Sequence, residues 1–165
     1  MNIFYRVIIF IVSIIIQAVA LAEQPIAAQA AHFSLKTELG AVISLGDYEG
    51  KPLVLHFWAT WCPYCKKLQP GLDTLYLEYQ KQGLEMVAIS FWEDDGAKPQ
   101  AELLKRGMHF TTLVDGDNVA KLYQVKGTPT TFFINKSGKV LWKTSNSDPD
   151  NPKLEQAIRA IITSS

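Results

Sequence analysis

Residues 53–67 have the sequence LVLHFWATWCPYCKK, an apolar run that leads into two cysteines three positions apart. The run from Leu53 to Trp58 is interrupted only by His56, which is typical of a strand buried on both faces of a sheet. A helix is predicted from Pro63 to Gln82, because apolar residues recur there at helical spacing. The apolar face of that helix comprises Leu68, Leu72, Leu75, Tyr76 and Tyr79. The two cysteines are therefore expected where the strand turns into the helix.

The composition of the chain limits the classes of protein to which it can belong. Its 165 residues are 48% hydrophobic and 19% charged, which excludes general disorder and favours one globular domain. Sixteen basic residues balance sixteen acidic ones, so no polybasic surface for nucleic acid is indicated. Two cysteines are too few for a disulfide-rich miniprotein or a four-cysteine zinc module.

The amino-terminal residues 1–22 are predicted to be a signal peptide or an uncleaved membrane anchor. The apolar run 7–22 is shorter than the roughly 20 residues that cross a bilayer, and Ala20 and Ala22 fit a cleavage site. Either alternative exports the rest of the chain, to the periplasm or the extracytoplasmic face of the membrane. The Ala-rich residues 23–31 are then expected to be a tether before a single domain at 32–165.

Strands and helices alternate along that domain. Strands are predicted at 32–37, 41–44, 53–58, 84–90, 111–114, 130–135 and 140–144, and helices at 63–82, 98–106, 118–123 and from 152 onward. Asn151 is the expected N-cap of the last helix, whose buried face comprises Leu154, Ala157, Ile158, Ile161 and Ile162. This order predicts an α/β fold in which a central mixed sheet is flanked by helices, with an amino-terminal β-hairpin.

The cysteine pair admits three interpretations. A structural disulfide that closes a four-residue loop would contribute only roughly 2 kcal/mol, a poor use of two cysteines. A zinc site is disfavoured, because the three histidines have no ligand-like spacing, whereas Cu(I) can be bound by two sulfurs alone. The third interpretation is a redox pair, and the position of the cysteines favours it.

A cysteine at a helix amino terminus faces unpaired N–H groups that stabilise its thiolate. Lowering a thiol pKa from about 8.5 to about 7 raises the thiolate fraction at neutral pH from ~3% to ~50%. Cys62 is therefore the expected exposed nucleophile. Cys65, one turn further on, is expected to be shielded and to resolve the mixed disulfide.

The segment from Phe57 to Lys67 resembles the active site of the thioredoxin superfamily, and more narrowly of the exported TlpA/ResA/DsbE-like thiol-disulfide oxidoreductases. The resemblance extends from about residue 32 to 162. Its second motif is GTPTTFFIN at 127–135, similar to the cis-proline loop, and a third match is Pro70, a proline that kinks the helix. It implies a thioredoxin-like fold and a cis bond before Pro129, with the Thr128 backbone and Pro129 pairing with substrate.

The resemblance also suggests two residues that could move the proton of the resolving thiol. His56 stands where thioredoxins carry a buried aspartate, and it is either a neutral core histidine or a replacement proton carrier. Glu93 follows the strand at 84–90 and matches a glutamate that ResA-like proteins place near their cysteines. Partial burial would raise its pKa and suit it to carrying a proton, whereas the alternative is a solvated loop acid.

Substrate contacts are expected from Trp61, Pro63 and Tyr64, with the two aromatic residues forming an apolar rim and Trp58 lying in the core. The Pro63-Tyr64 pair also resembles the glutaredoxin dipeptide, which leaves the direction of electron flow open.

The predicted function is that of an exported, monomeric thiol-disulfide oxidoreductase with no cofactor and no metal. The resemblance implies a membrane thiol donor and disulfide-containing exported proteins as partners, often in cytochrome c maturation. The alternatives are a Cu(I) chaperone that uses the same cysteines and a non-catalytic scaffold domain. A peroxidase is disfavoured, because Ala59 stands where peroxiredoxins carry threonine.

Overall fold

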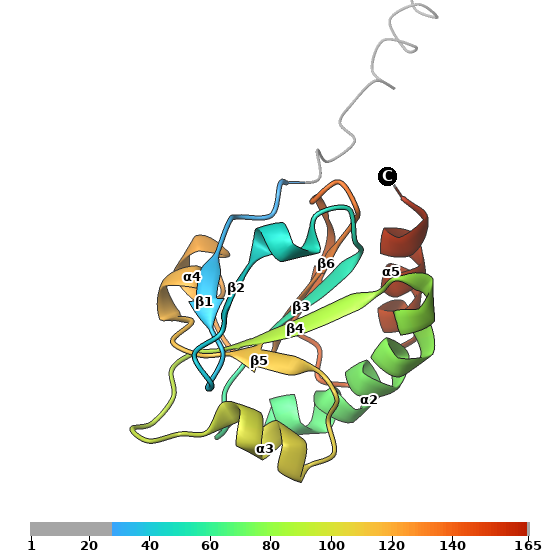
Figure 1. Ribbon diagram of the computed structural model, residues 1–165. Helices are drawn as coiled ribbons and strands as arrows, with labels where there is room; N and C mark the ends of the chain where they lie inside the picture. Colours follow the sequence, from blue (N-terminus) through green and yellow to red (C-terminus); the bar gives the residue numbers. More distant parts are fainter. Residues whose placement is uncertain (1–27, 165) are drawn as a thin grey trace, which may run out of the picture.

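The computed structural model describes residues 28–164, which form a five-stranded sheet and a separate two-stranded hairpin with helices around them (Figure 1). The strands are β1 Ser34–Lys36, β2 Val42–Ser44, β3 Leu53–Trp58, β4 Glu85–Ser90, β5 Thr111–Leu113, β6 Thr130–Ile134 and β7 Val140–Thr144. The helices are α2 Pro63–Tyr79, α3 Pro99–Lys105, α4 Asp117–Leu122 and α5 Pro152–Thr163, with 3-10 turns η2 Leu45–Tyr48 and η3 Gln80–Gln82.

The large sheet has the strand order β5-β4-β3-β6-β7. β3 is parallel to β4 and β4 to β5, whereas β6 runs antiparallel to both β3 and β7. β1 and β2 pair antiparallel in the smaller sheet. The predicted mixed sheet and amino-terminal hairpin are confirmed.

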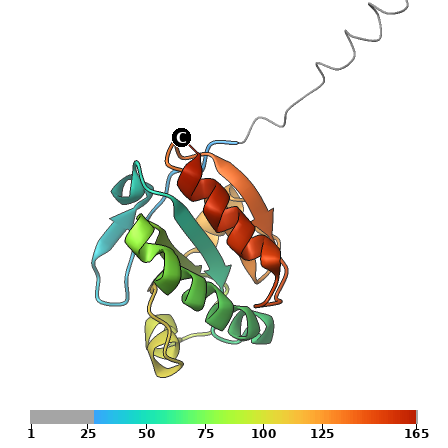
Figure 2. The ribbon, with the colours of Figure 1, turned by 90° about the vertical axis from the view of Figure 1, so that its right-hand side faces the viewer.

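Alternate residues of β3 face two separate cores. Leu55 and Phe57 pack in a cluster with α4 and the β1–β2 hairpin, whereas Val54 and Trp58 pack in a cluster with α2 and α5. Figure 2 shows α2 and α5 side by side over one face of the sheet. Because side chains alternate along a strand, His56 projects toward the face that α2 covers.

The boundaries of the elements follow local sequence signals closely. α2 ends at Tyr79, before the predicted Gln82, and continues as the turn η3 up to Gly83, whose φ of 88° suits a residue without a Cβ. Asn151 caps α5 as expected by accepting a hydrogen bond from the Lys153 N–H. The expectation that Ile162 is buried is wrong, because this residue lies at the edge of the core and is only partly covered.

The start of the described chain is packed against the large sheet. Ala30 is buried and donates its N–H to the Gly138 carbonyl at 2.8 Å, and Gln29 forms a β-bridge with Lys139. Residues 28–31 are thus part of the folded domain and not a free tether, because their backbone groups pair with the β6–β7 hairpin. The predicted leader at 1–22 lies outside the described residues. Between residues 28 and 164, no helix has the length and apolar character to cross a bilayer.

Candidate active site

Three loops meet at one edge of the large sheet. β3 ends at Trp58, which pairs with Ser90 at the end of the parallel strand β4. β6 is antiparallel to β3 and begins at Thr130, paired with Phe57. The loops that carry the cysteines, Glu93 and Pro129 therefore leave the sheet at the same edge, and the Thr128–Pro129 bond is cis, as the resemblance implied.

Cys62 and Cys65 form a disulfide with a Cα–Cα distance of 5.3 Å. Cys62 is the N-cap of α2, Pro63 occupies the first turn, and the Cys62 sulfur accepts a hydrogen bond from the Cys65 N–H at 3.1 Å. A sulfur in this position faces the unpaired N–H groups of the helix, where negative charge is stabilised.

The expectation of an exposed Cys62 is wrong for the disulfide form. Cys62 is 2% exposed and Cys65 is fully buried, both within the apolar cluster that includes Trp58 and Ala59. The bond to Cys65 holds the outer sulfur against these neighbours.

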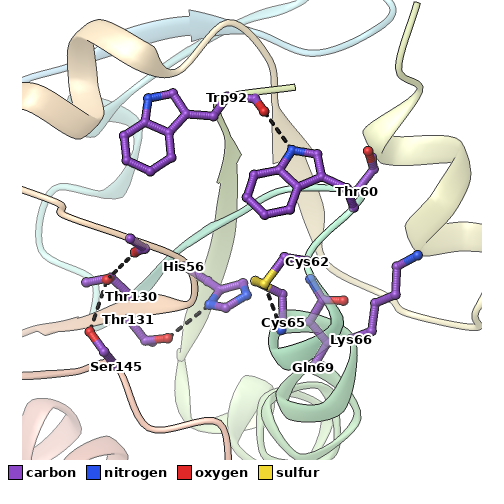
Figure 3. Close-up of a disulfide and its surroundings, with 12 residues drawn as sticks. His56, Thr60, Cys62, Cys65, Lys66, Gln69, Trp92, Thr130, Thr131 and Ser145 are labelled. Carbon is purple, nitrogen blue, oxygen red and sulfur yellow. Dashed lines mark hydrogen bonds between the residues drawn. A yellow bond between two sulfur atoms is a disulfide. The ribbon is translucent and has the colours of Figure 1, made fainter. Parts of the chain in front are cut away.

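Exposed aromatic residues lie beside the cysteine pair. Trp61 and Tyr64 are 47% and 63% exposed, which agrees with the predicted rim. The Trp61 indole N–H donates to the Trp92 carbonyl at 2.7 Å (Figure 3). Trp92 is itself half-exposed and has a φ of 55°, a conformation that is unfavourable for a residue with a side chain. Sequence analysis missed Trp92, since nothing in its local sequence indicates this turn.

Glu93 is hydrogen-bonded to the loop that leads to Cys62. Its carboxylate accepts hydrogen bonds from the Thr60 N–H at 2.8 Å, the Thr60 hydroxyl at 2.5 Å and the Ser90 hydroxyl at 2.6 Å. These contacts tie the end of β4 to the residues before Cys62. Glu93 therefore lies at the predicted edge of the sheet, and its described contacts are those of a residue that positions a loop.

His56 is a buried histidine next to the site. Its Nδ1 lies 2.9 Å from the Thr131 hydroxyl, and its ring points from β3 toward the cysteine pair (Figure 3). Burial lowers the pKa of His56 to about 3, so the ring is neutral at pH 7. Which of the two groups donates in this contact depends on the tautomer of the ring, and Nε2 has no partner among the described residues. His56 is thus a buried, hydrogen-bonded core histidine, and a proton-carrying role stays a prediction.

Burial of His56 predicts a pH-dependent stability. The unfolded chain binds a proton on this ring below about pH 6.5, whereas the folded protein binds it only near pH 3. The free energy of unfolding should therefore fall as the pH drops through this window, by up to about 1.4 kcal/mol per pH unit from this group. Urea denaturation of the wild type and His56→Gln tests this, with a flatter pH profile expected for the variant. Parallel profiles for the two proteins would contradict it.

Pro70 leaves one backbone carbonyl of α2 without its helical donor, and Arg106 donates to that carbonyl instead. Because Pro70 has no N–H, the Lys66 carbonyl lacks its helical donor, and the Arg106 guanidinium donates to it at 2.7 Å. The same guanidinium donates to the side-chain oxygen of Gln69, and Lys66 forms an ion pair with Glu102 at 3.2 Å. The end of α3 is thus fastened to the part of α2 that follows the cysteines.

Arg106→Leu is expected to lower the free energy of unfolding by about 2 kcal/mol, since it removes the donors of two acceptors on α2. Arg159→Leu is the matched control, because Arg159 is exposed and pairs with Glu155 one turn away, a contact that contributes little to stability. Chemical denaturation of the oxidised proteins measures both values. Equal effects of the two substitutions would show that the α2–α3 contact is unimportant.

The sheet topology, the cysteine pair at the start of α2 and the cis proline before β6 together define the class of thioredoxin-fold thiol-disulfide oxidoreductases. Residues 26–143 match the AhpC/TSA family, and the chain belongs to that family.

Named relatives make this assignment more specific. The chain is 36% identical over 114 residues to the thiol-disulfide oxidoreductase ResA of Halalkalibacterium halodurans, covering 68% of this chain and 64% of that protein. The chain thus spans slightly less than two thirds of the length of this relative. It is 31% identical over 140 residues to ResA of Bacillus thuringiensis subsp. konkukian, covering 84% and 80%.

A solved structure is similar over most of its length. It is a secreted Mycobacterium tuberculosis disulfide oxidoreductase homologous to Escherichia coli DsbE, with a TM-score of 0.67 and 26% identity, covering 78% of this chain and 95% of that one. The chain is thus a thiol-disulfide oxidoreductase of the ResA/DsbE type.

Proposed function

We propose that the protein is an exported thiol-disulfide oxidoreductase that reduces disulfide bonds of proteins outside the cytoplasm. The observation that carries the proposal is the Cys62–Cys65 pair at the amino terminus of α2. That position favours a thiolate, and the second cysteine is close enough to complete the exchange.

The exchange proceeds in two steps that balance. The Cys62 thiolate attacks one sulfur of the substrate disulfide, forms a mixed disulfide and expels the other substrate sulfur as a thiolate. Cys65 then loses its proton and attacks the Cys62 sulfur, which releases the second substrate sulfur as a thiolate. The substrate gains two electrons and two protons, and the protein ends as the Cys62–Cys65 disulfide.

Electrons for the next cycle come, in this proposal, from a thiol donor in the membrane. The direction, this donor and the exported substrates rest on the family resemblance, which favours components of cytochrome c maturation. The sequence has no Cys-x-x-Cys-His motif, so the protein would act on that pathway without binding haem through that motif. Location in the periplasm or on the extracytoplasmic membrane face rests on the predicted leader at residues 1–22.

Two residues are candidates for accepting the proton that Cys65 loses. His56 points toward the cysteine pair, but its lowered pKa makes it a weak base. Accepting a proton from a thiol of ordinary pKa would be unfavourable by about five powers of ten. Glu93 is held by Thr60 and Ser90, two residues of the same sheet edge. We therefore assign His56 a neutral role, and the proposal of proton transfer by Glu93 rests on the family resemblance.

The competing proposal is a Cu(I) chaperone, because two thiolates suffice for Cu(I). Between residues 28 and 164, no three His, Cys, Asp or Glu side chains gather as a metal site. The exposed aromatic rim beside the disulfide suits contact with a polypeptide, which favours exchange chemistry.

The test is reduction of insulin by the protein with dithiothreitol as the regenerating reductant. Faster precipitation of the insulin B chain than with dithiothreitol alone supports the proposal. No acceleration, together with binding of one equivalent of Cu(I), would replace it with the chaperone.

A further inference from the structure

The side-chain amide of Gln69 uses only part of its hydrogen-bonding capacity. Gln69 is fully buried, and its Nε2 has no partner among the described residues. Only two other buried side-chain atoms of residues 28–164 share this property, the Nε2 of His56 and the Oγ of Ser164. Buried N–H groups without an acceptor are costly and rare, so the amide calls for an explanation.

Arg106 fixes the orientation of this amide. A guanidinium carries only donors, so the atom of Gln69 that faces Arg106 is the oxygen, and the NH₂ group points elsewhere. Arg106 is itself held by the Lys66 carbonyl that Pro70 leaves open. The free donors of Gln69 therefore have one defined direction.

That direction leads to the resolving cysteine. Gln69 lies four residues after Cys65, so both side chains are on the same face of α2, and helical side chains lean toward the amino terminus. Figure 3 shows the Gln69 side chain extending toward the end of the helix that carries the disulfide. Cys65 is fully buried in an apolar cluster, where a thiolate needs a donor to be stable.

We propose that the Gln69 amide donates a hydrogen bond to the Cys65 sulfur when the disulfide is open, with Arg106 as the positioning residue. In the disulfide, the Cys65 sulfur is bonded to Cys62 and carries no charge. Once that bond is broken, the sulfur is free to rotate and becomes a charged acceptor on losing its proton. The hydrogen bond favours the thiolate that attacks the mixed disulfide, and it stabilises the reduced protein at pH values where Cys65 is ionised. The inference rests on the exchange function proposed above.

The experiment titrates Cys65 alone, in the Cys62→Ser protein, by the ultraviolet absorbance of the thiolate. Gln69→Leu should raise the pKa of Cys65 by about one unit, a tenfold loss of thiolate. Gln69→Glu should raise it further, because it replaces the donor with an acceptor that pairs with Arg106. Arg106→Leu should produce a smaller rise, since the amide then loses its fixed orientation.

The proteins with both cysteines give an independent measurement. Equilibration with glutathione at a pH above the Cys65 pKa of both proteins should show a tenfold shift toward the disulfide in Gln69→Leu, which corresponds to about 30 mV. Thr74→Ala is the matched control, because Thr74 hydrogen-bonds the Pro70 carbonyl on the exposed side of the same helix.

An unchanged Cys65 titration in both Gln69 variants overturns the inference, as does an equal shift in Thr74→Ala. Neither measurement depends on a substrate protein. The inference can therefore fail while insulin reduction succeeds, and insulin reduction can fail while the inference holds.

Discussion

Replacing Cys62 with serine is expected to reduce the rate of insulin reduction to that of dithiothreitol alone. The attacking species in disulfide exchange is a thiolate, and the serine hydroxyl neither ionises at neutral pH nor forms a disulfide. Cys65 remains in the variant, but it lies one turn inside α2 and not at the helix start, where a thiolate is most stabilised. The measurement is the initial rate of insulin precipitation at equal protein concentration.

Loss of the fold would not explain such a result. The reduced wild type also lacks the disulfide, which closes a four-residue loop and contributes only roughly 2 kcal/mol. The variant should therefore unfold at the same denaturant concentration as the reduced wild type. A Cys62→Ser protein that retains a tenth of the wild-type rate would show that exchange does not pass through Cys62.

The parts of the fold that were predictable depend on neighbours in the sequence. The apolar run at 53–58 became β3, and Pro63 and Gly83 mark the beginning and the end of the helical segment that follows. The position of Cys62 at the helix start follows from the same local signals. These features need only a few adjacent residues, and so the sequence indicates them directly.

The features that were missed depend on residues distant in the chain. Pro70 indicated an open carbonyl at Lys66, but its donor Arg106 is 40 positions away. The Trp61 side chain meets the Trp92 carbonyl 31 positions away, and Gln29 in the presumed tether pairs with Lys139. Tertiary packing brings these groups together, and one sequence gives no sign of the pairing. The burial of Cys62 under neighbouring apolar residues has the same origin.

Replacing Cys65 with serine is expected to leave Cys62 attached to its substrates. In the wild type, Cys65 is held next to Cys62, and intramolecular attack of this kind corresponds to effective concentrations of about 10⁵ M or more. Without it, the mixed disulfide awaits an external thiol, so its lifetime should rise by at least about 10³-fold. The variant is expressed in its own host, and free thiols are alkylated on lysis. The adducts are then separated on non-reducing gels and identified by mass spectrometry, which measures the trapped population.

The double variant Cys62→Ser/Cys65→Ser is the matched control, because it lacks the sulfur that forms the adduct and should give no trapped protein. Recovery of exported proteins through Cys62 supports exchange, and cytochrome assembly proteins among them would support the narrower proposal. The same preparation also tests export, since partners confined to the cytoplasm would contradict the location inferred from residues 1–22. If Cys65→Ser traps no partner while insulin reduction remains intact in the wild type, the nucleophile and the resolving thiol have been assigned in the wrong order.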